Sequence, residues 1–291
     1  MFTLITILTK ASVPYWNMYK RRLGEEGIAP LTIAHVPNLI GHPIGIALLF
    51  LTGLFLLPTD LLFYIYWVAL VIIAAIVGIF TILGLLETKF FTTQVIHSLG
   101  FVSSSICAVI FLNEKLNGWT VFALILGVLG VIFFSYKKSE NRFFVFDRGT
   151  IFTILAVVLA GFSSIFYKLA SFHVPNTFAF FTGRFVVDLI VWTIIWIFGL
   201  WMVGKNPFKD FSSLVKKPHG KIFILGNVAV TFIDSWLIFN LPITTIAILG
   251  TIAFPVTYFI SHFKYKEQIT PFMWLGTLCI VSSIILFLLV Q

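Results

Sequence analysis

The chain has 291 residues, of which 59% are hydrophobic and 10% are charged, and its mean hydropathy is +1.06. Soluble globular domains carry about 25% charged residues, so this composition excludes a soluble fold and predicts an all-α integral membrane protein. The formal net charge of +8 reflects 19 basic against 11 acidic residues. Because the basic residues cluster in short loops, we interpret them as contacts with anionic membrane lipid and expect no nucleic-acid binding.

Ten apolar stretches follow one another along the chain. Each has about 18 residues or more, enough for a helix to cross a hydrocarbon core of about 30 Å. They cover residues 2–21, 29–56, 61–86, 93–112, 118–136, 149–171, 177–203, 220–240, 244–263 and 271–290. The connections between them are short, as helical hairpins require. We therefore predict ten transmembrane helices.

The fourth and fifth stretches recur as the ninth and tenth. In each copy a Thr-Thr pair opens an apolar, small-residue segment, and an acidic residue, Glu114 or Glu267, ends it before a turn and a last apolar helix. Aligning the two acids gives an offset of 153 residues. We therefore predict two five-helix repeats, residues 1–140 and 141–291. For the two Glu residues we expect a turn or capping role, with gating as the alternative.

The distribution of Lys and Arg predicts the orientation in the membrane. Fifteen of them lie in the odd-numbered loops, whereas the opposite side holds Lys115 and, at its border, Lys168. Lys20 is counted in the first of these loops, and His97 is interpreted as interfacial. Since basic loops stay in the cytoplasm, both termini are expected outside the cell. Five helices per half then means that the halves are inserted in opposite senses, as an inverted repeat.

These features resemble a known family of transporters. Five-plus-five helices, a Glu-containing turn before the last helix of each half, and the pairs Tyr19-Lys20 and Tyr167-Lys168 are similar to EamA-type ten-helix members of the drug/metabolite transporter superfamily. The resemblance implies alternating access, a substrate site between the halves, and metabolites, amino acids or drugs as cargo. Small four-helix exporters of the superfamily trade protons through an acid in their first helix. Neither first-helix copy here contains Asp or Glu, so we do not expect that mechanism.

Polar residues at membrane depth need a partner or a function, because an ionisable side chain at the bilayer centre costs about 2.5–3.5 kcal/mol on insertion scales. Lys10 lies about halfway along the first span. Three polar residues of the second span share one helix face through i, i+3, i+7 spacing: His35, Asn38 and His42. Pro37 and Pro43 bracket this face, so we expect a discontinuous helix that exposes backbone groups to substrate.

The seventh and eighth spans supply the other candidate substrate-binding residues. Arg184 and Asp188 are spaced i, i+4 and are predicted to form an ion pair; whether Arg184 also touches substrate is left as an alternative. The eighth span contributes Asp234 and Trp236. A pairing of Asp234 with Lys10, at comparable depth, is a further alternative. The predicted substrate site thus comprises Lys10, Asn38, His42, Arg184, Asp188, Asp234 and Trp236.

No pattern in the sequence indicates an enzyme. The close pair His35 and His42 has no carboxylate on its own helix, and no Walker lysine loop is present. Cys107 and Cys279 lie in apolar stretches without metal-ligand spacing and are interpreted as packing residues. We therefore expect no catalytic residue, no metal site, no cofactor and no direct use of ATP.

The most economical function is a secondary transporter, or permease, of the plasma membrane that moves a small polar or anionic metabolite. Lys10, His42 and Arg184 would complement an anion, with coupling to protons or exchange. The first alternative is efflux of hydrophobic or cationic compounds, since Asp188 and Asp234 can hold a cation. The second alternative is a non-transporting subunit that assists a membrane partner. Substrate identity, direction, coupling ion and oligomeric state do not follow from the sequence.

Overall fold

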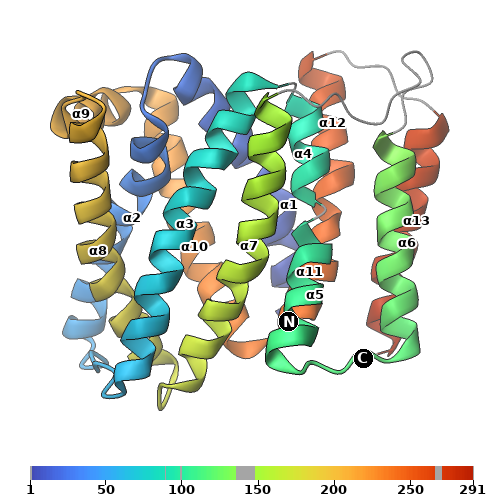
Figure 1. The fold of residues 1–291 in the computed structure, drawn as a ribbon, viewed down its shortest axis with the longest axis horizontal. Coiled ribbons are helices and arrows are strands. Elements are labelled where there is room, and N and C mark those ends of the chain that lie inside the picture. Colours follow the sequence, from blue (N-terminus) through green and yellow to red (C-terminus); the bar gives the residue numbers. More distant parts are fainter. Residues whose placement is uncertain (1, 89, 99, 136–147, 266–270, 291) are drawn as a thin grey trace.

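The structure, a computed structural model, describes residues 2–88, 90–98, 100–135, 148–265 and 271–290. All regular secondary structure in these ranges is helical (Figure 1). The elements are α1 (Phe2–Glu25), α2 (Pro30–Leu51), α3 (Leu61–Glu87), α4 (Phe90–Ser98), α5 (Gly100–Leu112), α6 (Gly118–Ser135), α7 (Arg148–Phe172), α8 (Thr177–Met202), α9 (Pro207–Lys216), α10 (Pro218–Asn240), α11 (Ile243–Leu249), the 3₁₀ turn η1 (Gly250–Ile252), α12 (Ala253–Tyr265) and α13 (Pro271–Val290).

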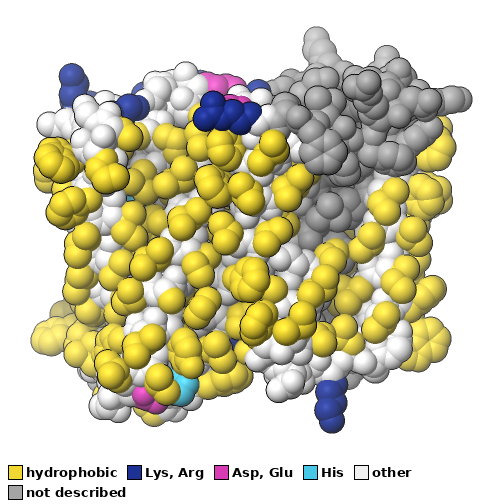
Figure 2. Space-filling model, in the orientation of Figure 1, with side chains coloured by type: hydrophobic (Ala, Val, Ile, Leu, Met, Phe, Trp, Pro, Cys, Tyr) yellow, Lys and Arg dark blue, Asp and Glu magenta, His cyan; other side chains and the backbone are white. Residues whose placement is uncertain are grey.

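Four helices of the described ranges, α2, α3, α7 and α8, are long and apolar enough to cross a membrane. Figure 2 shows hydrophobic side chains over the middle of the visible face, with Lys and Arg at its upper and lower margins. These are the features of a membrane protein. Helices also occupy the other predicted spans. The first of them, α1, carries several charges. The predicted spans 93–112 and 244–263 are each divided, the former into α4 and α5 and the latter into α11, η1 and α12.

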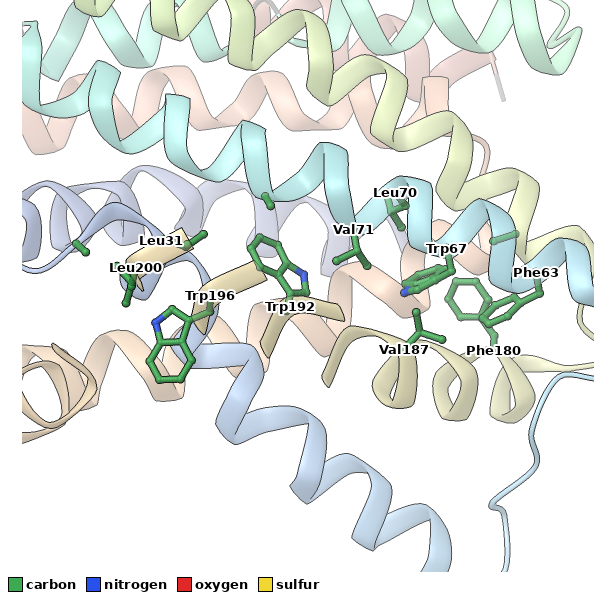
Figure 3. Close-up of a cluster of buried hydrophobic side chains, with 13 residues drawn as sticks. Leu31, Phe63, Trp67, Leu70, Val71, Phe180, Val187, Trp192, Trp196 and Leu200 are labelled. Atoms are coloured by element: carbon green, nitrogen blue, oxygen red, sulfur yellow. The ribbon is translucent and has the colours of Figure 1, made fainter. Parts of the chain in front are cut away.

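The largest buried core lies where α2, α3 and α8 meet (Figure 3). Phe63, Trp67, Phe180 and Trp196 are among the largest fully buried side chains of the protein. Phe63 stacks on Trp67 with ring centroids 5.6 Å apart, and Trp67 meets Phe180 edge to face at 5.2 Å. Each such aromatic pair contributes about 0.5–1.5 kcal/mol beyond its area burial. This core holds α3 and α8 in a fixed relation, which positions the polar residues that both helices carry.

The predicted break in the second span is wrong. α2 is helical from Pro30 to Leu51, with Pro37 and Pro43 inside it. Each proline removes one backbone donor, but packing on both sides of the prolines keeps the helix continuous. One example is Gly45, where a Cβ would come within 2.5 Å of Phe185 on α8. Tertiary packing therefore overrides the proline signal, and α2 stays one continuous helix.

The helix geometry changes instead in the ninth predicted span, where η1 joins α11 to α12. Pro255 stands in the first turn of α12 and has no N–H, so the carbonyl of Thr251 lacks its normal helical donor. A 3₁₀ turn, which uses i→i+3 hydrogen bonds, absorbs the change. Gly250 at its start lies beside Lys10, since a Cβ there would be 3.9 Å from Lys10 Cγ. The interruption thus lies next to a predicted site residue.

Glu114 caps a helix of the opposite predicted half. Its carboxylate accepts hydrogen bonds from the Ile243 N–H at 3.2 Å, from the Thr244 N–H at 3.4 Å and from Thr244 Oγ1 at 2.8 Å. These are the first residues of α11, whose amide groups need acceptors. The predicted capping role is therefore confirmed for Glu114, whereas Glu267 lies outside the described residues.

Several helices pack in close pairs that are spread across the molecule (Figure 1). α3 lies along α7, α2 along α8 and α6 along α13, the last pair standing together in Figure 1. Gly130 on α6 leaves no room for a Cβ, which would lie 2.9 Å from the Gly276 carbonyl oxygen on α13. Ser283 Oγ of α13 also donates to the Ala123 carbonyl of α6 at 2.6 Å. α1 is different, because two cavities separate it from some of its neighbours.

A charged cluster ties the connection after α1 to the start of α10. Glu26 accepts hydrogen bonds from Lys217 Nζ, from His219 Nε2 at 2.9 Å and from Arg22 Nε at 3.2 Å. Partial burial raises the pKa of Glu26, but the hydrogen bonds from Lys217, His219 and Arg22 outweigh it and lower that pKa to about 2. The folded protein therefore holds this carboxylate ionised, and the cluster is an electrostatic link between two distant segments.

The link predicts a pH-dependent contribution to stability. Because the pKa of Glu26 falls from its ordinary value of 4.5 to about 2 on folding, its contribution is present above pH 4.5 and is lost as the pH falls toward 2. Glu26→Gln should therefore lower the melting temperature at neutral pH and reduce its decline between pH 4.5 and 2. Thermal unfolding of both proteins across this range measures the difference. Glu25→Gln, which removes a neighbouring carboxylate from an exposed pair with Arg21, is the matched control; an equal effect of both substitutions would contradict the prediction.

Candidate functional site

Two cavities flank α1 in its C-terminal two thirds. Cavity A, of about 380 Å³, lies between α1, α3, α4, α5, α7 and the α11–η1–α12 segment. Cavity B, of about 350 Å³, lies between α1, α7, α8 and α10. Val13, Asn17 and Lys20 line both cavities, so one stretch of α1 forms their common wall. Both volumes lie at the lower end of the range of about 300–1,000 Å³ that small-molecule sites occupy.

Lys10 on α1 and Asp234 on α10 form an ion pair across this wall. Lys10 Nζ lies 2.9 Å from Asp234 Oδ1 and 3.1 Å from Oδ2. Lys10 lines cavity A and Asp234 lines cavity B. The pairing, one of the alternatives that the sequence left for these two charges, is thus confirmed. Because each group neutralises the other, neither brings a net charge to its cavity.

Arg184 and Asp188 form the predicted i, i+4 pair on α8, with Arg184 Nε 3.4 Å from Asp188 Oδ2. The two residues are 8% and 5% exposed. Arg184 Nη1 donates to Tyr167 Oη at 2.9 Å and to the Thr231 carbonyl at 3.3 Å, while Trp67 Nε1 donates to Asp188 Oδ1 at 2.6 Å. Both charges are therefore hydrogen-bonded as well as paired. Arg184 also lines cavity B, so its contact with a substrate stays a prediction.

Four predicted site residues line neither of these cavities: Asn38, His42, Asp188 and Trp236. His42 is buried, stacks on Phe185 with centroids 5.2 Å apart, and places Nε2 3.5 Å from Asp188 Oδ2 without a hydrogen bond. Asn38 on α2 and Trp236 on α10 are half-buried. The structure therefore brings His42 to the Arg184–Asp188 pair, and it does not bring Asn38, His42 and Trp236 together with Lys10 around one cavity.

A group of polar residues at the other end of cavity A is not among the predicted site residues. Lys20 on α1 and Gln94 and His97 on α4 line this cavity together with Asn17. Asn17 Nδ2 donates to Gln94 Oε1 at 3.2 Å. Gln94 Nε2 and His97 Nε2 are buried and have no hydrogen-bond partner in the described part of the chain. We call Lys20, Gln94 and His97 the Lys20 cluster.

Helix length explains why the Lys20 cluster was missed. The predicted first span ends at residue 21, and Lys20 is counted there in a loop with Arg21 and Arg22, whereas α1 extends to Glu25. A usable signal exists, since Val13, Asn17 and Lys20 are spaced i, i+4, i+7 and therefore share one helix face. Arg21 and Arg22 lie on other faces and pair with Glu25 and Glu26.

The chemistry that the cavities offer consists of charged and hydrogen-bonding groups. Among the residues that the structure describes, no group of three or more His, Cys, Asp or Glu side chains is placed to hold a metal ion. Cys107 on α5 and Cys279 on α13 are free thiols. Lysine, amide, imidazole and hydroxyl groups in a mostly apolar cavity are typical of sites that orient a small polar molecule.

Comparison with known proteins informs the fold alone. No family model matches the chain, and no curated protein matches its sequence. Among solved structures, 28 chains match. One of them, described only as "Crystal structure of protein", is 12% identical and has a TM-score of 0.69, with 100% of this chain and 99% of that chain covered. The helical arrangement is therefore one that a solved protein shares over its whole length.

Proposed function

We propose that the protein is a secondary, ATP-independent transporter that moves a small polar metabolite across the plasma membrane by alternating access. The observation that carries this proposal is cavity A, whose wall includes residues of α1, α3, α4 and α5 from the first predicted repeat and of α7, α11 and α12 from the second. Transporters built from inverted repeats bind their substrates between the repeats near the bilayer midplane, often beside an interrupted helix. The η1 turn at the edge of cavity A matches that design.

The pattern of helix neighbours supports ten transmembrane helices in two inverted repeats, 1–140 and 141–291. α1 packs against α10 and against α12, which belong to the second repeat. α7, the counterpart of α1, packs against α3 and against α4 and α5, which occupy the corresponding places in the first repeat. The pairs α2 with α8 and α6 with α13 join counterparts directly. Exchange of the two halves therefore reproduces the pattern, as a two-fold axis between the repeats requires.

A comparison of α1 with its counterpart α7 suggests how the transporter alternates between its two open states. α7 lines both cavities with Ala160, Ser164 and Tyr167, but it packs tightly against α3, since Gly84 on α3 has no room for a Cβ beside Thr153 on α7. α1, its counterpart, has cavities A and B along its length. In a two-fold transporter the opposite state would close the gaps around α1 and open equivalent gaps around α7. The Lys10–Asp234 ion pair links α1 to α10 across the proposed moving boundary.

We further propose the orientation that the basic loops predict. The start of α1 and the end of α13 lie toward the same, lower side in Figure 1. The Glu26–Lys217–His219 cluster joins the end of α1 to the start of α10, and the basic segment 205–221 runs from the end of α8 to the start of α10. Both therefore lie on the side opposite to the start of α1. The rule that basic loops stay inside places this cluster in the cytoplasm and both termini outside.

The side-chain pairings favour a metabolite over the two alternatives. Efflux of cations needs an acid that is available to the substrate, but Asp234 is paired with Lys10, and Asp188 is engaged by Arg184 and Trp67. A non-transporting subunit does not need polar cavities at the boundary between its halves. The resemblance to the drug/metabolite transporter superfamily is retained as part of this proposal.

The first experiment is a thermal-unfolding screen of the detergent-purified protein. The library should contain carboxylic acids, amino acids, sugar phosphates, nucleotides and amphipathic cations. A ligand at about 100 times its Kd stabilises the folded state by about 2.7 kcal/mol. Each stabilising compound is then tested for counterflow in proteoliposomes, where we expect labelled compound to exchange against unlabelled compound inside.

The outcomes separate the candidate functions. Binding with counterflow supports the transporter, and the class of ligand names its cargo. Counterflow of hydrophobic cations alone would favour the efflux alternative over a polar metabolite. Ligands that bind but never exchange would overturn transport, and an absence of ligands with stable co-purification of another protein would favour the partner subunit.

A further inference from the structure

We propose that the Lys20 cluster in cavity A anchors the carboxylate of a small monocarboxylic acid, which is the transported substrate. The proposal rests on the function proposed above, and it adds the substrate class and the end of the cavity at which the charged group binds. It assigns the recognition of charge to Lys20 in place of Lys10, His42 and Arg184.

The Lys20 cluster contains hydrogen-bond donors that have no acceptor in the described part of the chain. Gln94 and His97 are one helical turn apart on α4, and both line cavity A beside Lys20 of α1. Asn17 Nδ2 donates a hydrogen bond to Gln94 Oε1, so the side-chain atom of Gln94 that is left without a partner is the donor Nε2. Gln94 is 5% exposed, and a buried donor without an acceptor destabilises the protein. A bound oxygen anion would supply the missing acceptor.

The charge balance of cavity A also calls for an anion. Among the residues that the structure describes, its lining contains Lys10, Lys20 and His97 but no Asp or Glu. Lys10 is neutralised by Asp234. Lys20 forms no ion pair in the described part of the chain, although it stands within the span of α1. One ammonium group that lines cavity A is therefore left without a counter-charge in the described part of the chain.

The count of one free charge selects a monocarboxylate. A phosphate dianion would retain one unpaired negative charge, which is costly away from bulk water. An amino acid would bring an ammonium group as well, and the described lining of cavity A holds no acidic side chain to receive it. The remaining wall combines apolar groups such as Val77 and Ile246 with the hydroxyl groups of Ser104 and Ser164. It suits a short hydrocarbon chain that can bear hydroxyl groups.

The test compares end groups on one hydrocarbon skeleton. The probes are straight and branched carboxylates of three to eight carbons, each with its amide, its amine, its 2-amino acid and its phosphate ester, titrated against the full-length protein by thermal unfolding. We expect the carboxylates to bind, and to bind more tightly than every other member of their sets. Lys20→Met should weaken carboxylate binding at least tenfold, about the loss of one charged hydrogen bond, while Lys20→Arg retains most of the affinity.

Further variants keep the result interpretable. Lys221→Met changes an exposed lysine at the start of α10 and should leave the affinity unchanged. Gln94→Leu should weaken binding several-fold without altering any charge, and Lys20→Gln replaces Lys20→Met if the latter fails to fold. An unchanged affinity in Lys20→Met or Lys20→Gln would overturn the anchor, as would equal binding of the amides or the amines. Binding and counterflow of another ligand class, with no carboxylate bound, would overturn the anchor and preserve the transporter, whereas the absence of any ligand and any counterflow would overturn both.

Discussion

Arg184→Gln is expected to lower the free energy of unfolding by about 3–5 kcal/mol, because it leaves the buried Asp188 carboxylate without its positive partner. Arg184 is 8% exposed and holds Asp188, Tyr167 and the Thr231 carbonyl together. Asp188 is 5% exposed and also receives the Trp67 indole N–H at the edge of the largest core. Loss of either charge therefore disturbs α3, α7, α8 and α10 at once.

A double variant separates the cost of an unpaired charge from the value of the pair. Asp188→Asn should destabilise by a similar amount, since Arg184 is then left uncompensated, although the new amide oxygen can still accept from Trp67. Arg184→Gln combined with Asp188→Asn removes both charges and should recover at least half of the loss. The measurements are melting temperatures and denaturant midpoints in one detergent.

An exposed pair of the same spacing provides the control. Arg21 and Glu25 are also spaced i, i+4, with Arg21 Nε 2.8 Å from Glu25 Oε1, but they lie at the helix end and the Glu25 side chain is 54% exposed. Exposed pairs contribute about 0.2–1 kcal/mol, so Arg21→Gln should have a small effect. Equal losses at Arg21 and Arg184 would show that burial does not decide the strength of the central pair.

Charge and spacing made parts of the candidate site predictable from the sequence. The i, i+4 rule identified Arg184 and Asp188, and comparable depth along two spans suggested Lys10 with Asp234; both contacts are present. The duplicated position of Glu114 at a span end indicated a cap, which it forms on α11. In each case a buried or terminal polar group has few available partners, so a local rule is sufficient.

Other features depend on packing that no local rule contains. Pro37 and Pro43 indicate a break, yet α2 stays helical, whereas Pro255 coincides with a true change of geometry at η1. The same residue type therefore has different consequences according to the packing around it. The position of Lys20 depended on the length of α1, and helix ends are the least certain part of a sequence-based assignment.

The Lys10–Asp234 pair leads to a prediction about specificity, which rests on the anchor proposed for Lys20. Lys10 and Lys20 both line cavity A, ten residues apart on α1, or about 15 Å along the helix axis. In the described part of the chain, Asp234 is the acid that neutralises Lys10 and keeps it from acting as a second cationic site. Both side chains of the pair are partly accessible, at 19% and 27%, so the loss of one partner is less costly here than at Arg184.

Asp234→Asn is therefore expected to convert a monocarboxylate site into one that prefers dicarboxylates. With Lys10 released, cavity A holds two uncompensated positive charges, and a second carboxylate on the ligand gains a partner. Two opposite charges about 4 Å apart attract by about 4 kcal/mol at an effective dielectric constant near 20, and one third of that gives a tenfold change in affinity. Titration with dicarboxylates of four to eight carbons should show a preference over the matching monocarboxylates at least tenfold above that of the unaltered protein, and the preference should fall as salt is added. Lys10→Met in the same chain removes the second charge again and should restore the original preference. If Asp234→Asn weakens both ligand series equally, the pair only fastens α1 to α10, and the free charge of Lys10 does not reach the ligand.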